Sequence, residues 1–448
     1  MCAAVNGQPS RGTAVIIEVL KQQTADDFST ARRPLISRVR FQLSGGILCA
    51  VLPVAIRSQF SLDFALRESL NHASLGAVIA IVLGYYLIRR IGFFPGVQMG
   101  AQILFAISAS FALVALALFL LHLHYSRFVF ATSYCLALGW FIGVHLILQR
   151  RVRPQLALVP GGNANGLMDL PGAQWRILAT PPKDLGNLSA VVADLRHDLS
   201  DEWERFIADC TLRGLPVFHT KQVQESLTGK VEIEHLSENT FGSLLPSLTY
   251  LKIKHAIDWV TALILLPLFL VAFLLVAPLI MLESSGPVFY RQRRVGYRGL
   301  PFTVYKFRTM RSHEPGKGGA DDRDAAITQD DDERVTRVGR YLRRYRIDEL
   351  PQILNILKGE MSWIGPRPEA ASLADWYEAE LPFYRYRHVV RPGITGWAQV
   401  NQGHVAHPQE VLEKLHFDFF YIKRLSPWLD LLIAIRTVMT ILRGFGAK

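Results

Sequence analysis

Cysteine is scarce in this 448-residue chain, which contains only four, and none of them forms a CxxC pair. They are scattered along the sequence at Cys2, Cys49, Cys135 and Cys210. Zinc sites and disulfide frameworks need cysteines at close or regular spacings, so we expect neither kind of site. The cysteines are interpreted as ordinary small residues of an apolar interior.

Acidic residues are also in deficit, because 38 Asp and Glu stand against 49 Lys and Arg, which gives a net charge of +11. Half of the residues are nevertheless hydrophobic, and this share indicates membrane segments. Such a basic membrane protein is expected to contact anionic membrane lipids or phosphorylated substrates, and no nucleic acid. The polar N-terminus lacks the basic-then-apolar run of a signal peptide.

Four long apolar segments fill the first third of the chain, at residues 41–59, 73–88, 99–122 and 128–149. A helix needs about 20 mainly apolar residues to cross a bilayer, so we expect four membrane helices, of which the second is short. Arginines cluster before the first segment and after the second and fourth, which places both ends of this bundle in the cytoplasm. The segments show no conspicuous acid or Asn cluster. This favours an anchor and assembly surface, compatible with a homo-oligomer, over a transport pathway.

Residues 154–245 have a different character, because short apolar runs alternate with a helical stretch at 201–213. This alternation predicts a small α/β domain that is Rossmann-like. The first predicted strand is followed by the Gly- and Asn-rich loop Pro160–Gly166. The GxGxxG spacing of a dinucleotide loop is absent. We therefore favour a turn in a structural or regulatory domain over a nucleotide site.

A fifth apolar run, Trp259–Leu282, is long enough to cross the membrane, but basic residues stand on both of its flanks. Positive charges on both flanks favour the cytoplasmic side for both ends. Pro267 and Pro278 also interrupt helical hydrogen bonding within the run. We expect a re-entrant helix over 255–282 that enters the membrane and returns, with an ordinary fifth span as the alternative.

Two further segments have less specific patterns. Glu314–Glu333 is polar, Gly-rich and acidic, but its spacing fits no calcium loop. We interpret it as a mobile, solvated loop that can close over a substrate. Phe417–Arg443 mixes apolar and basic residues, and it is interpreted either as helices at the membrane surface or as part of the core of the C-terminal region.

Asp348 and Glu349 form a carboxylate pair that follows closely on Arg343, Arg344 and Arg346. Adjacent carboxylates repel each other, and nearby cations keep both ionised. An ionised carboxylate can attack a phosphoryl centre while its neighbour holds a divalent cation. Alone, the pair is more typical of a surface ion-pair cluster than of a catalytic site.

Cationic residues in other segments favour the catalytic interpretation. Lys306 and Arg308 alternate with apolar residues, as on a strand, and Arg367 and Arg391 stand in Gly- and Pro-rich turns. Arginines held in rigid turns bind phosphate oxygens in pairs. Together these residues predict a site lined for phosphate groups.

The order of these motifs resembles the bacterial sugar transferase family, the monotopic polyprenyl-phosphate hexose-1-phosphate transferases, in the large form with four N-terminal transmembrane helices. The matching stretches cover nearly all of residues 252–448 in order. They are Lys254–Asp258, Gly286–Gly296 (GPVFYRQRRVG), Val304–Met310 (VYKFRTM), Arg346–Gln352 (RIDELPQ), Asn355–Pro368 (NILKGEMSWIGPRP) and Arg391–Asn401 (RPGITGWAQVN).

The resemblance implies an activity. Such enzymes move a hexose-1-phosphate from a UDP-sugar to undecaprenyl phosphate and release UMP, in the first membrane step of exopolysaccharide, capsule or O-antigen assembly. It implies that Asp348 is the nucleophile that forms a covalent phosphosugar intermediate, and that Glu349, with Asp348, binds Mg²⁺. The substrate-binding residues implied by the matching motifs are Lys306, Arg308, Arg343, Arg367, Arg391 and Gln399.

Three points stay open. UDP-glucose is the expected donor, with UDP-galactose as the alternative, because specificity can rest on one or two hydrogen bonds. The Ser-Pro that family members commonly carry midway through the re-entrant helix is missing near Leu270-Val271. The alternatives are a shifted break in this helix and a different position of the segment in the membrane. The rival functions are a non-catalytic membrane scaffold for polysaccharide assembly and a polytopic transporter.

The expected architecture therefore has four parts. Residues 1–40 form a cytosolic segment, 41–150 the transmembrane region and 151–250 the small α/β domain. Residues 251–448 form a mainly α, monotopic catalytic module. We expect a multi-pass protein of the bacterial inner membrane whose catalytic module faces the cytoplasm.

Overall fold

The computed structural model of the chain describes residues 35–59, 64–91, 99–151, 155–168, 170, 174–182, 188–233, 246–311, 334–381, 383–402 and 408–443. These residues belong to two compact units, Met1–Gly229 and Lys230–Lys448. The loop predicted at Glu314–Glu333 lies outside the described residues.

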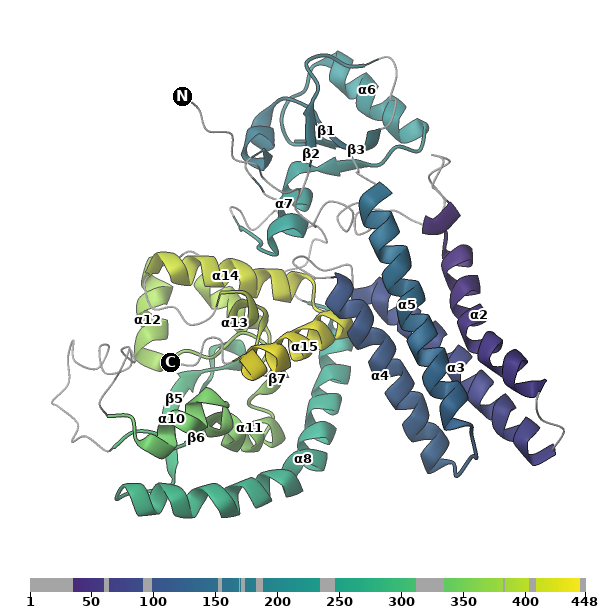
Figure 1. Cartoon of the computed structure of the whole chain (residues 1–448). Coiled ribbons are helices and arrows are strands. Elements are labelled where there is room, and N and C mark those ends of the chain that lie inside the picture. Colours follow the sequence, from purple (N-terminus) through teal and green to yellow (C-terminus); the bar gives the residue numbers. More distant parts are fainter. Residues whose placement is uncertain are drawn as a thin grey trace, which may run out of the picture. The chain divides into compact units, whose positions relative to one another are not determined.

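The first unit begins with the short helix η1 (Leu35–Ser37), which is followed by long apolar helices (Figure 1). They are α2 (Val39–Ser58), α3 (Phe64–Ile91), α4 (Met99–Leu120) and α5 (Arg127–Arg151). Each coincides with one predicted segment and is long and apolar enough to cross a membrane. α3 is longer than predicted because its polar first turns, with Arg67 and Glu68, continue the same helix.

Close packing of small residues brings these helices together. A Cβ atom on Gly45 of α2 would lie 2.0 Å from the ring of Trp140 on α5. The Trp140 indole also donates a hydrogen bond of 3.0 Å to the carbonyl oxygen of Gln42. Approach of this kind is typical of helix interfaces in membranes, where small residues line the contact. The interior of the bundle contains Ile81, Ile107, Phe111 and Phe141.

A small parallel sheet follows the helices in the first unit, as the sequence predicted. Its strands are β1 (Gln155–Leu158), β2 (Gln174–Ile177), β3 (Leu188–Ala193) and β4 (Val217–His219), in the order β2-β1-β3-β4. The helical elements η2 (Gly162–Leu167), α6 (Asp201–Leu212) and α7 (Thr220–Thr228) connect or follow the strands. The buried strands are rich in Val, Leu and Ala, which is typical of parallel sheets.

The glycine-rich loop after β1 packs against the end of β3. Gly161 and Gly162 have φ angles of 131° and 53°, and a Cβ atom on Gly162 would lie 2.3 Å from a carboxylate oxygen of Asp194. That carboxylate accepts a hydrogen bond of 2.9 Å from the backbone N–H of Asn163. The two glycines therefore let this loop close tightly on Asp194.

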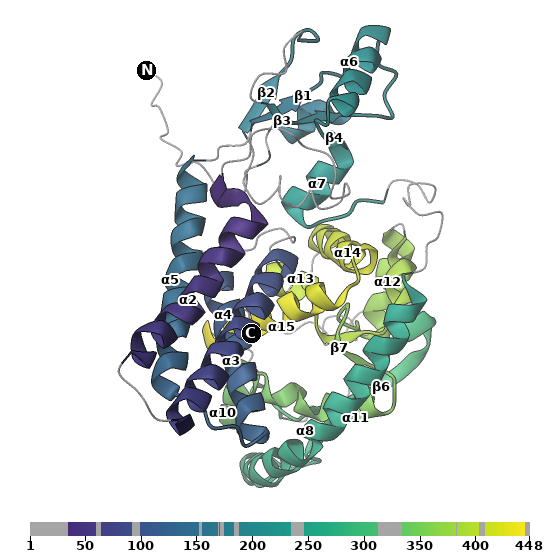
Figure 2. The ribbon, with the colours of Figure 1, turned by 90° about the vertical axis from the view of Figure 1, so that its right-hand side faces the viewer.

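The second unit contains the remaining elements (Figure 1 and Figure 2). Its strands are β5 (Phe289–Val295), β6 (Pro301–Phe307), β7 (Ser362–Ile364) and β8 (Gly393–Thr395). Its α-helices are α8 (Leu248–Glu283), α10 (Arg337–Arg344), α11 (Ile353–Leu357), α12 (Ala371–Glu380), α13 (Trp397–Asn401), α14 (Pro408–Lys423) and α15 (Pro427–Arg443). Its short helices are η4 (Tyr297–Gly299), η5 (Ile347–Gln352) and η6 (Tyr384–Val389).

β5 and β6 form an antiparallel ribbon, in which Tyr290 pairs with Lys306 and Arg291 pairs with Tyr305. Successive side chains of a strand point to opposite faces, so Lys306 and Tyr305 face in opposite directions. Tyr305 shares its face with Arg291, whose guanidinium lies 5.8 Å from the centre of the tyrosine ring.

The first residues of the second unit contact α14. The backbone N–H of Val231 donates to the carbonyl oxygen of His416 at 3.0 Å, and Lys230 forms an ion pair with Glu413. The last two helices, α14 and α15, contribute many buried apolar residues, such as Phe420 and Leu429. The predicted segment at 417–443 therefore packs into the core of this unit along part of its length.

α8 changes direction between its two halves, as both views of the ribbon show (Figure 1 and Figure 2). Pro267 and Pro278 lie inside the helix, and proline removes a hydrogen bond and bends a helix. The first turns of the helix contact the rest of the unit, since the hydroxyl of Tyr250 donates to a carboxylate oxygen of Asp430 at 2.7 Å. Because these turns are held by the rest of the unit, the helix begins before the predicted residue 255.

The other end of α8 contacts the same unit. The carboxylate of Glu283, the last residue of the helix, accepts hydrogen bonds from the backbone N–H groups of Arg337 and Val338 at 2.6 and 2.9 Å. A straight helix of 36 residues would be about 54 Å long. The bend allows both ends of α8 to bind one compact unit.

Candidate active site

The carboxylate pair lies in η5, a short helix that follows directly on α10. Asp348 and Glu349 are both buried, with 8% and 4% of their surfaces exposed. The residue before the helix, Arg346, adopts the left-handed conformation with φ 56° and ψ 20°, which a residue with a side chain rarely adopts. Pro351 is the fifth residue after Arg346 and supports the tight local geometry.

Glu349 is surrounded by cations that come from three different segments. Its Oε1 atom lies 3.0 Å from Nζ of Lys306 on β6, 2.8 Å from a terminal nitrogen of Arg367 and 3.8 Å from one of Arg346. Burial alone would raise the pKa of Glu349, but attraction to Arg367 and Lys306 outweighs it and holds this pKa well below its usual value. Glu349 is therefore an ionised carboxylate.

Asp348 differs from Glu349 in its hydrogen bonding and in the direction of its pKa shift. Its Oδ1 atom is buried and has no hydrogen-bond partner among the described residues. Burial raises the pKa of Asp348, and the neighbouring charge of Glu349 adds to the rise, although Lys306 opposes it. A buried carboxylate oxygen without a partner is costly to keep. Its position beside three cations is typical of a reactive group rather than a structural one.

The charge of Glu349 affects the pKa values of its two nearest cations, Lys306 and Arg367. Burial lowers the pKa of Lys306, although Glu349 counteracts this effect. Attraction to Glu349 raises the pKa of Arg367 above its ordinary value. Both groups are donors without acceptor capacity, and together they form a cationic wall on one side of the carboxylate pair. Such a wall can bind the oxygens of a diphosphate.

The structure separates the sequence-predicted residues into two groups. Lys306 and Arg367 contact Glu349. Arg343 donates to the hydroxyl of Thr309 at 2.9 Å, and Arg308 donates to the carbonyl oxygens of Ser284 and Ser285 at 2.6 and 2.7 Å. These two residues connect β6 with the end of α8 and with α10.

Arg391 and Gln399 bond elsewhere in the unit. Arg391 donates to the carbonyl oxygen of Gly359 at 2.9 Å and lies over the ring of Tyr297. The amide of Gln399 donates to the carbonyl oxygen of Ile394 at 3.1 Å. In the described structure these contacts brace the turns that precede and follow β8.

A second set of buried charges, which sequence reasoning missed, lies behind Arg367. Arg387 forms an ion pair of 2.8 Å with Asp418, and Glu369 forms one with Lys414. Lys414 and Asp418 are four residues apart on α14, so they share one face of the helix. Two charged residues of opposite sign at this spacing in an apolar helix were the only sequence signal of this set.

The carboxylate pair is the candidate for holding a metal ion. Among the described residues, no three or more of His, Cys, Asp and Glu gather as a metal site would require. Mg²⁺, however, is usually bound by one or two carboxylates together with substrate phosphates and water. The pair of Asp348, with its unpartnered oxygen, and Glu349 fits that mode of binding.

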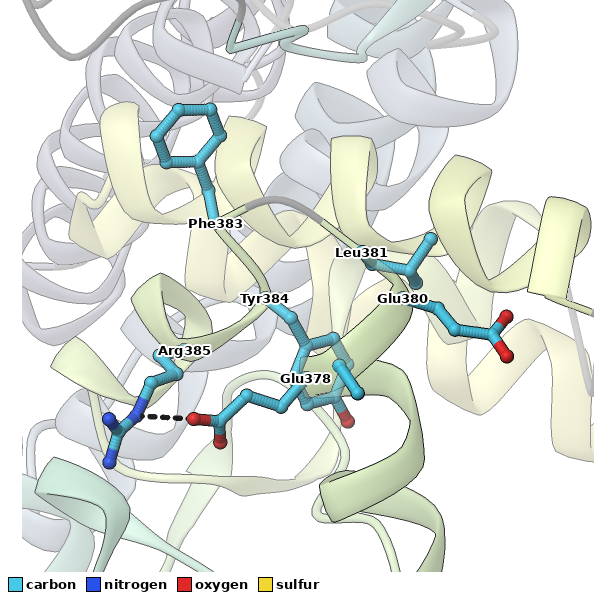
Figure 3. A pocket seen from close by; sticks show the side chains of 7 residues that line it. Glu378, Glu380, Leu381, Phe383, Tyr384 and Arg385 are labelled. Atoms are coloured by element: carbon cyan, nitrogen blue, oxygen red, sulfur yellow. Dashed lines mark ion pairs between the residues drawn. The ribbon is translucent and has the colours of Figure 1, made fainter.

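Two pockets of the second unit are lined by residues other than this pair. One open pocket of about 400 Å³ is bordered by the end of α12 and by η6. Figure 3 shows that Arg385 pairs with Glu378 there, at 3.0 Å, while Phe383 points away from them. A second hollow of about 10 Å³ lies against Arg367 and Arg387, and it has room for about one water molecule.

Comparison with known proteins places these residues in context. The family model for "Bacterial sugar transferase" matches residues 249–444. The UDP-N-acetylgalactosamine-undecaprenyl-phosphate N-acetylgalactosaminephosphotransferase of Aeromonas hydrophila is 46% identical over 374 residues, which cover 83% of this chain and 87% of that protein.

Other relatives match a smaller share of the chain. The UDP-glucose:undecaprenyl-phosphate glucose-1-phosphate transferase of Caulobacter vibrioides is 44% identical over 203 residues, 45% of this chain and 74% of that protein. The Escherichia coli protein of the same description is 40% identical over 200 residues, 44% of this chain and 41% of that protein. The residues matched by the family model include the buried carboxylate pair.

Proposed function

Because this chain belongs to the bacterial sugar transferase family, we propose that it transfers a sugar 1-phosphate from a UDP-sugar to undecaprenyl phosphate and releases UMP. The observation that carries this proposal is the buried pair in η5, in which Glu349 is held by three cations while an oxygen of Asp348 has no partner. Asp348 supplies the nucleophile and the cations receive the phosphates.

The reaction follows as two displacements at one phosphorus atom. A carboxylate oxygen of Asp348 attacks the β-phosphorus of the UDP-sugar, and the bond from that phosphorus to the bridging oxygen breaks, so that UMP leaves with the electron pair. A phosphate oxygen of the lipid then attacks the same phosphorus, and the carboxylate of Asp348 departs. No proton has to move, because both nucleophiles react in their ionised forms.

Lys306 and Arg367 orient the donor by contacting its phosphate oxygens, while they keep Glu349 ionised. Glu349 and Asp348 are the residues that would hold Mg²⁺ together with the diphosphate. When bound, the ion would offset the negative charge that develops on UMP. Because the site is buried, each of these electrostatic effects is larger than it would be in water.

N-acetylgalactosamine is the first candidate for the transferred sugar. The relative that matches both units of the chain over 374 residues acts on UDP-N-acetylgalactosamine. Glucose, expected from the sequence, is the second candidate, since several relatives that match a smaller share of the chain are named for UDP-glucose. The product would begin an exopolysaccharide, capsule or O-antigen at the cytoplasmic face of the inner membrane.

The proposal includes a membrane helix that returns to the side it entered. Both ends of α8 bond to one compact unit, and both flanks of its apolar run are basic. The lipid phosphate would then reach Asp348 from the same face of the membrane as the soluble donor.

The decisive experiment is UMP release by the purified full-length protein in the presence of undecaprenyl phosphate and Mg²⁺. The donors are UDP-N-acetylgalactosamine, UDP-N-acetylglucosamine, UDP-glucose and UDP-galactose. We expect lipid-dependent release with the first and loss of release in Asp348→Asn. Release with UDP-glucose alone would replace the first candidate sugar, and no release from any donor would favour a non-catalytic scaffold.

A further inference from the structure

We propose that Arg387 and Asp418 are positioning residues, which hold the backbone of the turn that carries Arg367 so that its guanidinium meets Glu349. The expected effect on the reaction rate rests on the proposed function, whereas the expected effect on the position of Arg367 does not. Neither residue contacts the carboxylate pair in the described structure, so any effect on the reaction would pass through Arg367.

The turn between β7 and α12 is held by its carbonyl oxygens. In Pro366–Glu369, each of four consecutive carbonyl oxygens accepts a hydrogen bond from a different residue. The donors are the backbone N–H of Gly393, the guanidinium of Arg387, the guanidinium of Arg294 and the backbone N–H of Val295. With prolines on both sides of Arg367, the backbone has little freedom left. The direction of the Arg367 side chain is therefore set by these donors.

Arg387 is the donor to the carbonyl oxygen of Arg367 itself, at 2.8 Å. The same guanidinium donates to Oδ2 of Asp418 from two nitrogens, at 3.1 and 2.8 Å, and to the hydroxyl of Tyr384 at 2.8 Å. The side chains of Arg387 and Asp418 are only 3% and 2% exposed. All of these contacts exploit the planar fork of arginine, which the single ammonium of lysine cannot reproduce.

Asp418 fixes the guanidinium on α14. Without its negative charge, the buried guanidinium would lose its 2.8 Å counter-ion and keep the longer ion pair of 3.9 Å with Glu369, which is unfavourable in a low-dielectric interior. One turn earlier on the same helix face, Lys414 forms an ion pair with Glu369, the last residue of the turn. α14 thus holds the Arg367 turn at two points, one directly through Lys414 and one through Asp418 and Arg387.

The position of the Arg367 guanidinium determines the expected effect on the reaction rate. The guanidinium of Arg367 lies 2.8 Å from Oε1 of Glu349, and a displacement of about 1 Å in a positioned group can lower a rate by about 100-fold. Replacing Arg387 by Lys keeps one positive charge for Asp418 but loses at least one of the other contacts. We therefore expect kcat/KM to fall by about 10- to 100-fold.

The experiment uses the full-length protein in detergent or nanodiscs and has two readouts. The first measures the modification rate of Arg367 by phenylglyoxal, resolved by mass spectrometry, in Arg387→Lys, Asp418→Asn and the milder Tyr384→Phe. Arg385→Lys, which alters an exposed ion pair on the same η6 helix, is the matched control. We expect faster modification of Arg367 in the first two variants, a smaller increase in the third and no change in the control.

The second readout is a double-mutant cycle on UMP release with Arg367→Lys. If Arg387 acts through Arg367, the double variant should lose little more activity than Arg367→Lys alone, whereas a purely structural role makes the losses multiply. Unchanged modification of Arg367 in correctly folded Arg387→Lys and Asp418→Asn protein overturns the inference. Absence of UMP release from the unaltered protein instead overturns the proposed function, and the labelling experiment still decides the positioning role.

Discussion

Asp348 and Glu349 are neighbours in the chain, yet their surroundings shift the pKa values of their carboxyl groups in opposite directions. Burial raises the pKa of Asp348, whereas Arg367 and Lys306 overcome the effect of burial on Glu349 and lower its pKa. Two titratable groups driven apart in this way take different roles in a reaction. Glu349 is the permanent anion that organises the cations, and Asp348 is the group left available to react.

Replacing the proposed nucleophile tests this division of roles. Asp348→Asn should abolish both UMP release and the covalent phosphosugar adduct, with a loss of activity on the order of 10³-fold or more. The adduct can be trapped by acid quenching after incubation with a donor labelled at its β-phosphate, in the absence of lipid acceptor. Labelled adduct at full yield in Asp348→Asn would show that another residue is the nucleophile.

The left-handed backbone at Arg346 provides a test of strain next to the pair. Both Arg346→Gly and Arg346→Ala lose the cation 3.8 Å from Glu349, but only glycine adopts φ 56° without steric cost. We expect Arg346→Gly to be more stable than Arg346→Ala by about 1 kcal/mol. Equal unfolding midpoints of the two detergent-solubilised variants would contradict this expectation.

His388 should make the stability of the protein depend on pH. Burial, together with the charges of Arg387 and Arg385, lowers the pKa of His388 from 6.5 to about 3. Between about pH 3 and pH 6.5, His388 of the unfolded chain binds a proton that His388 of the folded chain does not. The contribution of His388 to the free energy of unfolding is therefore fully present above about pH 6.5 and falls as the pH decreases below that value. The change in melting midpoint between pH 7 and pH 5 should be smaller in His388→Gln. An identical change in both proteins would show that His388 contributes nothing to this dependence.

The course of α8 in the membrane can be measured by cysteine labelling. In a variant whose native cysteines are replaced by serine, Lys252→Cys and Ser285→Cys introduce a thiol at an exposed position on either side of the apolar run. If the helix returns, a membrane-impermeant reagent should label both from the cytoplasmic side. Gln59→Cys, at the end of α2, is the control for the opposite side, and labelling of Ser285→Cys from that side would indicate a fifth span.

The sequence predicted those parts of the site that are encoded locally. The carboxylate pair and Arg346 stand within three residues of each other, so the contact of Arg346 with Glu349 needed no knowledge of the fold. Arg343, which the sequence also placed beside the pair, donates to Thr309. Lys306 was predicted because β6 alternates polar and apolar residues, and Arg367 because two prolines flank it. The structure brings both of these cations to Glu349.

The contacts behind the site depend on tertiary structure and left no such pattern. Arg387 meets Asp418 across 31 positions of sequence and two different helices. Arg391 and Gln399 stand in a motif as prominent as that of Arg367, yet their side chains bond to the backbone of other turns. The start of α8 was also missed, because its polar residues are unlike a membrane segment and become helical through contacts with residues such as Ser362 and Asp430.

The pairing of β5 with β6 limits how this protein can change in length. Lys306 faces Glu349, whereas its neighbour Tyr305 lies on the other face of the ribbon, where Lys358 reaches its hydroxyl at 3.0 Å. A single residue inserted or deleted in β6 ahead of Tyr305 would exchange the faces of these two residues, turning a phenol toward the carboxylate pair and a cation away from it. A change of one residue in β6 is therefore compatible with the site only where a β-bulge restores the register.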